Sequence, residues 1–107
     1  MRTATEGSGD NHIFLRGSLT GRPLSRSPLS AGESWSFQLT VTREHGTHVD
    51  TIDCCTKLAR VRRTVENAGS GDELVVLGSL RRRFWRSPAG LVSRYEVDVV
   101  SVRISSR

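Results

Sequence analysis

Lysine is nearly absent from this 107-residue chain: of 16 basic residues only Lys57 is lysine, so arginine carries the positive charge. Long apolar runs are absent too. The longest spans residues 74–77, whereas a transmembrane helix needs about 20 apolar residues. The first ten residues contain no apolar segment like that of a secretory signal. We therefore expect a flexible arm over residues 1–10, no membrane segment, and a protein that stays in the cytoplasm.

Cysteine is limited to the adjacent pair Cys54 and Cys55. A structural zinc site takes four ligands, and no CxxC or His/Cys spacing supplies them here. In a strand, two consecutive side chains point to opposite faces. We therefore expect one buried thiol, one outward thiol and no bound metal. Pairing of an outward Cys55 between subunits is the alternative.

Catalytic patterns are also missing. Asp50 and Asp53 lie three residues apart on one expected strand, and so point to opposite faces. His12, His45 and His48 lie at a strand start and around a turn, without a GxSxG, HExxH or Walker-type context. The sequence therefore predicts a protein that is not an enzyme and needs no cofactor.

What the chain does contain is positive charge: its formal net charge is +5 and its isoelectric point is near 10.5. Such a balance favours a polyanionic partner, with nucleic acid first and an acidic membrane surface second. A GC-rich coding sequence also favours arginine over lysine, so composition alone is a weak argument. The arrangement of the arginines is a stronger one.

Alternation of apolar and polar residues predicts five strands, and a helical period predicts one helix. The expected strands are residues 12–20, 35–42, 49–55, 73–85 and 91–104, with a loop at 21–34 and turns at 43–48 and 86–90. The helical stripe comprises Leu58, Val61, Val65 and Ala68, with Thr56 as the expected N-cap and Gly69 at the end. A phase slip between Val99 and Val100 indicates a bulge, or a strand covered on both faces.

The order β-β-β-α-β-β is typical of an all-β, five-stranded Greek-key barrel of the oligonucleotide/oligosaccharide-binding (OB) type. One short helix would separate strands 3 and 4, and strands 4 and 5 would form a long hairpin. We expect residues 11–105 to form this single domain, because the chain is too short for two cores. An SH3-like barrel and an open sheet with one helix are the alternatives.

Residues 79–90, SLRRRFWRSPAG, combine a cationic run with large aromatic side chains. With a period of two, Arg81, Arg83 and Trp85 share one face, and successive side chains lie about 6–7 Å apart. Guanidinium groups can meet phosphates there while a base stacks on the indole. Sequence-tolerant binding of single strands requires that combination.

The opposite side of the same stretch is expected to begin in the core with Leu80. Arg82 and Phe84 share that side but lie beyond Leu80, where the hairpin projects past the barrel. Alternatively, the aromatic residues of the hairpin pack against a neighbouring strand or another subunit, and the arginines are only a solvated edge. Trp35 is expected in the core or at its rim, and Phe14 suits a subunit interface equally well.

Four segments carry a family pattern in consistent order: NHIFLRGSLTGRP, SFQLTVTRE, KLARVRRTV and, most specific, GDELVVLGSLRRRFW. Spanning residues 11–104, they resemble the bacterial single-stranded DNA-binding protein family. The resemblance implies an OB fold that assembles as a homotetramer through its first strand, with single-stranded DNA wrapped over the surface. It places Trp85 on a stacking position, with Arg81 and Arg83 as contacts to the DNA backbone.

Two departures from the family pattern stand out. Further stacking aromatics of the family correspond here to His45, Thr51 and Lys57, of which only histidine can still stack. The chain ends in VRISSR rather than in a long linker with an acidic tip, so recruitment of other enzymes through a tail is not expected. We therefore expect a short, specialised paralogue with weaker or more electrostatic binding.

The primary hypothesis is sequence-tolerant binding of single-stranded DNA in replication, repair or recombination, by a cytoplasmic, nucleoid-associated homodimer or homotetramer. The expected binding residues are Trp85, Arg81, Arg83, Arg86, Phe84, Arg43, His45, Lys57 and Arg62. RNA is an alternative ligand, because stacking and phosphate contacts are common to both nucleic acids. The alternative function is an OB-fold protein-interaction subunit of a replication, conjugation or phage complex, with weak or no nucleic-acid binding.

Overall fold

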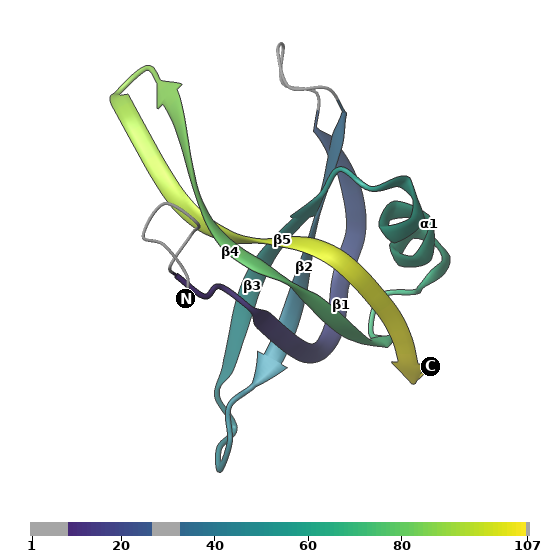
Figure 1. Cartoon of the computed structure of the whole chain (residues 1–107). Coiled ribbons are helices and arrows are strands. Elements are labelled where there is room, and N and C mark those ends of the chain that lie inside the picture. The colour runs from purple at the N-terminus through teal and green to yellow at the C-terminus, as the bar shows by residue number, and fades with distance from the viewer. Residues whose placement is uncertain (1–8, 27–32, 107) are drawn as a thin grey trace, which may run out of the picture.

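A computed structural model of the chain describes residues 9–26 and 33–106, so most of the expected arm, residues 1–8, lies outside it. The elements are β1 (Ile13–Arg26), β2 (Ser34–Thr42), β3 (Val49–Thr56), α1 (Ala59–Asn67), β4 (Glu73–Ser87) and β5 (Gly90–Ser106). The strands close into a barrel in the order β1-β2-β3-β5-β4 (Figure 1). The predicted five-stranded OB barrel with one helix between β3 and β4 is confirmed, and an open sheet is excluded.

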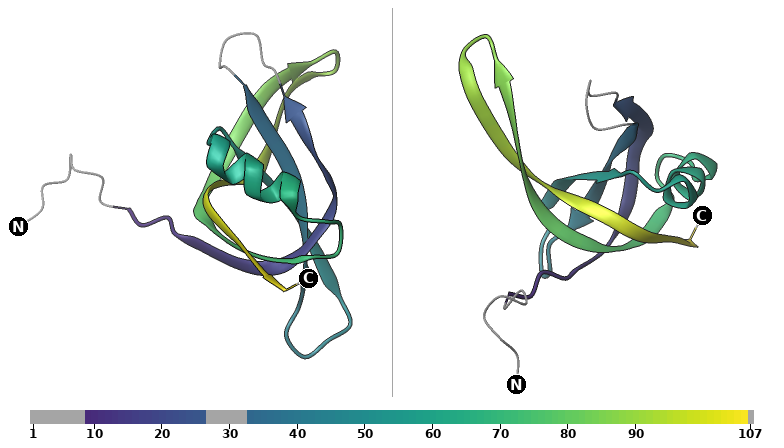
Figure 2. Two further views of the ribbon diagram at one scale, coloured as in Figure 1. Left: turned by 90° about the vertical axis from the view of Figure 1, so that its right-hand side faces the viewer. Right: turned by 45° about the horizontal axis from the view of Figure 1, so that its top comes forward.

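The core is built from the inward-facing residues of the alternating strands and is covered at one end by α1 (Figure 2). Val61 and Val65 of the predicted helical stripe are fully buried, while Leu58 and Ala68 pack against the core from its margin. Burial of one such valine contributes roughly 1.5–3 kcal/mol, so the stripe fixes the helix on the barrel. Among the described residues, no helix is long and apolar enough to cross a membrane.

The predicted N-cap of this helix is wrong. Thr56 is the buried last residue of β3, and the N-cap position is occupied by Leu58, which makes no side-chain capping bond. The Thr56 hydroxyl instead donates to the carbonyl oxygen of Val99 at 3.0 Å and accepts from the Leu58 N–H at 3.1 Å. It therefore ties the start of the helix to β5. The helix ends before Gly69, as predicted.

Strand β1 is longer than predicted, because it continues through residues that had been assigned to a loop. Gly21 has a φ of +74°, and the pairing register with β2 shifts between Thr20 and Leu24. Glycine and proline at this point mark a bend in a long strand that stays paired with β2 as far as Arg26. Residues 27–32 of the predicted loop lie outside the described residues.

The predicted irregularity in β5 is a bulge. Leu77 pairs with Ser101 and Gly78 pairs with Val99, so Val100 is left over and exposed. Gly78 lies so close to β5 that an added Cβ would collide with the carbonyl oxygen of Asp98. The bulge turns β4 and β5 away from the barrel at this point.

Leu80 was predicted in the core, but 41% of its surface is exposed. The reason is that β1 pairs with β4 no further than Gly78, so β4 is paired with β5 alone beyond that residue. The side chain of Asn11 satisfies the Leu80 backbone N–H and carbonyl there, with two 2.7 Å hydrogen bonds. Beyond it, β4 and β5 remain paired with each other to the turn and project as a two-stranded hairpin (Figure 1).

Candidate nucleic-acid interface

One face of the projecting hairpin, which we call the groove face, carries the residues predicted to bind a strand. Arg81, Arg83 and Trp85 alternate along β4, and the cross-strand partner of Arg83 is Arg94. The partner of Arg81 is Glu96. The regular pairing of β4 with β5 therefore places several cations and one indole along a single surface.

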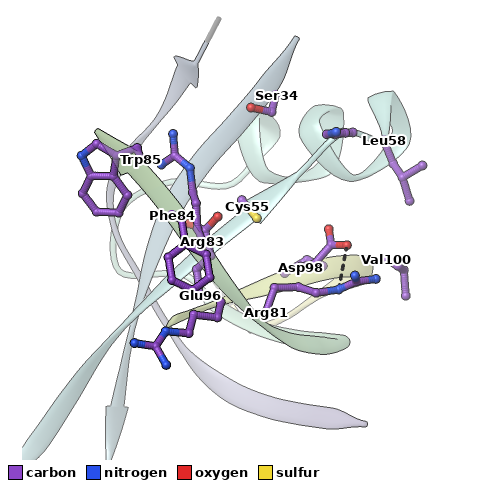
Figure 3. A pocket seen from close by; sticks show the side chains of 13 residues that line it. Ser34, Cys55, Leu58, Arg81, Arg83, Phe84, Trp85, Glu96, Asp98 and Val100 are labelled. Carbon is purple, nitrogen blue, oxygen red and sulfur yellow. Dashed lines mark ion pairs between the residues drawn. The ribbon is translucent and has the colours of Figure 1, made fainter. Parts of the chain in front are cut away.

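The groove face overlooks the outer surface of β2 and β3, and together they border two cavities. The first, of about 730 Å³, is lined by Lys57, Arg81 and Trp85 among others (Figure 3). The second, of about 610 Å³, lies over β2 and β3 and is lined by Arg94. Arg83 and Glu96 border both cavities, so the two lie side by side on the barrel surface, and we call them together the groove.

Trp85 is oriented by arginines, not by the barrel core. The Cζ atoms of Arg83 and Arg94 each lie 5.3 Å from the centroid of its ring. Cation–π contacts of this kind contribute about 0.5–1 kcal/mol each at exposed sites. The indole is partly exposed and is not part of the buried core cluster. It is therefore held in a defined position while remaining open to a ligand.

Three carboxylates also lie on the groove surface, and they were not foreseen. Arg94 donates to Asp53 at 3.0 Å, and Asp53 accepts a second hydrogen bond, of 2.8 Å, from Gln38. Arg81 and Asp98 form a longer ion pair of 3.9 Å, and Glu96 is buried at 6% exposure. These acids offset part of the positive charge and hold arginine side chains in place. They come from β3 and β5, far in sequence from the cationic run.

The structure does not bring all the predicted binding residues together. Lys57 borders the groove, whereas Arg86 falls on the opposite face of the hairpin, paired with Leu91. Arg62 projects from α1, where its guanidinium lies 4.7 Å above the ring of Trp35 and pairs with Glu66 at 2.9 Å. Trp35 is half-buried, and it is not among the residues that pack against the core cluster.

Arg43 and His45 lie at the β2–β3 turn, which points away from the tip of the β4–β5 hairpin (Figure 1). Arg43 forms a bidentate pair with Asp50, with distances of 2.8–3.2 Å. This hydrogen bonding lowers the pKa of Asp50 and raises the pKa of Arg43. His45 is almost fully exposed and has a φ of +60°. Neither residue shares a surface with Trp85.

The two cysteines differ in environment. Cys54 is fully buried, and burial raises the pKa of its thiol to about 12, with the neighbouring Cys55, Asp53 and Glu96 adding to the shift. Cys55 is half-buried and borders the first cavity. The predicted division into one buried and one outward thiol is thus confirmed. The described residues contain no cluster of side chains suited to a metal ion.

No protein-family model and no curated protein matches the chain. Among solved structures, it is similar to a small single-stranded DNA-binding protein from Streptomyces coelicolor, with 20% identity and a TM-score of 0.67, over 91% of this chain and 96% of that one. It is also similar to a Plasmodium falciparum single-stranded DNA-binding protein in complex with single-stranded DNA, with 17% identity and a TM-score of 0.71, over 87% and 88% of the two chains. The fold is an OB fold shared with single-stranded DNA-binding proteins. At these identities the likeness establishes the OB fold alone, which agrees with the resemblance seen in the sequence.

Proposed function

We propose that the protein binds single-stranded DNA along the groove, with little sequence preference. The observation that carries the proposal is Trp85, partly exposed and oriented by Arg83 and Arg94 in an open groove. Both similar structures are of single-stranded DNA-binding proteins, and one of them is a complex with single-stranded DNA. In this site a base stacks on the indole, which contributes about 1–3 kcal/mol per base, while arginines follow the phosphates.

Besides Trp85, the only exposed ring among the described residues that border the groove is that of Phe84. Phe37 borders the second cavity but is buried at 4% exposure, and Thr51 on β3 has no ring. Electrostatic contacts from Arg81, Arg83 and Lys57 would therefore contribute a large share of the affinity. Such binding weakens as salt rises, because neutralising phosphates releases counterions.

The biological setting we propose is replication, repair or recombination in the bacterial cytoplasm, in association with the nucleoid. We further propose that the chain forms a homodimer or homotetramer. Phe14 and Leu77 support this, because they are cross-strand partners on the outer surface of β1 and β4 and both are exposed. Exposed apolar residues that adjoin one another mark protein interfaces more often than scattered single ones do. RNA remains an alternative ligand of the same groove.

The same exposed pair favours one second candidate function, a protein-interaction subunit with weak or no nucleic-acid binding. A pull-down after nuclease treatment separates the two functions, since a true protein partner survives removal of the nucleic acid. Loss of every partner on nuclease treatment would eliminate this candidate.

The direct test of the proposal is fluorescence anisotropy of labelled oligo(dT), titrated with the full chain at two salt concentrations. We expect saturable binding at low salt and a lower affinity at high salt, with a similar result for mixed-sequence DNA. An absence of binding at low salt would overturn the proposal. A matched RNA oligonucleotide, titrated under the same conditions, reports the preference between the two nucleic acids.

A further inference from the structure

The face of the hairpin opposite the groove face carries a second cluster of aromatic and cationic side chains. Arg82 of β4 lies between two rings, with its Cζ 5.2 Å from the centroid of Phe84 and 5.4 Å from that of Tyr95. Its guanidinium also donates to the Ser93 hydroxyl at 3.0 and 3.3 Å. We call Arg82, Phe84, Arg86 and Tyr95 the second face. Its central cation is held in place by three neighbours.

The rings of the second face are open to solvent. Phe84 and Tyr95 are each 58% exposed, although Tyr95 has the same side-chain parity as the buried Val97. Both rings lie beyond the barrel, so no core surrounds them. A guanidinium covers part of each ring, and the exposed remainder offers a flat apolar surface. Side chains of this size gain from stacking on another flat group.

The charge of the second face differs from that of the groove face. Its cross-strand pairs are Arg82 with Tyr95, Phe84 with Ser93, and Arg86 with Leu91, and none contains a carboxylate. The groove face, by contrast, includes Glu96 and Asp98. Cations without acids beside stacking aromatics suit an anionic strand of bases.

Both edges of the hairpin are free of other strands near its tip, so a ligand can pass from one face to the other. Strand β1 stops pairing with β4 at Gly78, and β5 pairs with β3 only at Val97 and Asp98, so both edges are open nearer the tip. The first cavity also borders Arg82 and Phe84 in addition to the groove face. A hairpin of two strands is only about 5 Å wide between strand axes. A flexible polymer that leaves the groove can therefore continue onto the second face.

We propose that the second face is an additional single-stranded DNA-binding surface, so that DNA contacts the hairpin on both sides. Bases stack on Phe84 and Tyr95, while Arg82 and Arg86 contact phosphates. The proposal rests on the proposed function, since it assumes that single-stranded DNA is the ligand of the groove. It adds that Trp85 is not the only stacking position on the hairpin.

The first test is photocrosslinking of the unmodified protein to oligo(dT) carrying 5-iodouracil, followed by mapping of the crosslinked peptides. Tyr95 is the diagnostic residue, because it lies on the opposite face from Trp85 and on a different strand. We expect crosslinks at both Trp85 and Tyr95. Crosslinks confined to Trp85 would overturn the second face and leave the groove intact. If wild-type protein does not bind oligo(dT) at all, the proposed function itself fails.

The second test compares Tyr95→Ala with Tyr95→Phe and Leu91→Ala in anisotropy titrations with oligo(dT). We expect Tyr95→Ala to weaken binding roughly 5- to 150-fold, as the loss of one stacked base predicts. Tyr95→Phe keeps the ring and should bind like wild type. Leu91→Ala is a matched control, because Leu91 is 65% exposed and lies on the same side without a ring.

Other outcomes count against the second face. Equal affinity of Tyr95→Ala and wild type would overturn it. Light scattering on the same variants gives the oligomeric state. A smaller assembly for Tyr95→Ala and Leu91→Ala alike would identify this surface as a subunit interface and would also overturn the proposal.

Discussion

Replacement of Asp53 by Asn should make the protein bind single-stranded DNA more tightly. Asp53 holds the guanidinium of Arg94 at 3.0 Å, with 31% and 51% of their side chains exposed, so the pair contributes about 0.2–1 kcal/mol. This carboxylate competes with a phosphate for the Arg94 guanidinium. An asparagine oxygen still accepts from Gln38. We therefore expect affinity to rise about 1.4- to 5-fold, with stability nearly unchanged.

The assay is an anisotropy titration with oligo(dT) over a series of salt concentrations. One additional arginine–phosphate contact should steepen the logarithmic salt dependence by about 0.7. Asp50→Asn is the matched control, because it releases Arg43 from the same kind of pair at the distant β2–β3 turn. If both variants gain affinity equally, net charge and not release of Arg94 is the cause. An unchanged slope in Asp53→Asn would refute the reasoning outright.

Three further predictions concern the stability and chemistry of the fold. Gly78→Ala should lower the free energy of unfolding, measured by urea denaturation, by roughly 1–3 kcal/mol or more, because the added methyl group meets backbone atoms. Gly46→Ala is the control and should have little effect, because the nearest atom to its added Cβ is 3.7 Å away. Because the pKa of Cys54 is raised to about 12, its thiol stays protonated at pH 8. Iodoacetamide should therefore modify only Cys55 in the native protein and both cysteines after denaturation. Mass spectrometry counts the modified cysteines. The pKa of Asp50 is lowered in the folded state, so its contribution to stability is present above the ordinary value of 3.8 and is lost as pH falls through the lowered value. An NMR titration of the Asp50 carboxyl should show this shift, and a normal pKa would contradict the bidentate pair.

Much of the fold could be predicted because the apolar residues alternate so regularly. The stripe containing Val61 and Val65 gave the helix and its buried side. The phase slip at Val100 gave the bulge, since a single unpaired residue is what inverts the pattern of a strand. Such features are local, and so they are visible in one sequence.

The error at Leu80 arises because periodicity predicts which side of a strand a residue lies on, but not whether that side is covered. Leu80 lies on the core side of β4, yet β1 pairs no further than Gly78 and only β5 runs beside it. Tyr95 shares parity with buried valines and is exposed for the same reason. A strand that continues beyond its barrel keeps its alternation, so the sequence does not mark where the core stops.

The candidate site was also only partly visible from the sequence. Arg81, Arg83 and Trp85 are close in sequence and were grouped correctly on one face. Arg94 and Asp53 reach the same surface through the pairing of β4 with β5 and the closure of the barrel. Sequence spacing does not show that Asp53 lies on this surface. The position of Arg94 opposite Arg83 follows from the register of the hairpin, which is set by the turn at Pro88 and Ala89.

The measurement that tests the central claim most directly is tryptophan fluorescence of the Trp35→Phe protein during titration with oligo(dT). Trp85 is then the only tryptophan of the chain, because the sequence contains two. We predict quenching of Trp85 at low salt that is reversed by added salt, and a loss of affinity of about 1–3 kcal/mol when Trp85 is replaced by Ala in the wild-type chain. Binding without any change in Trp85 fluorescence, together with full affinity of Trp85→Ala, would contradict the claim that a base stacks on this indole.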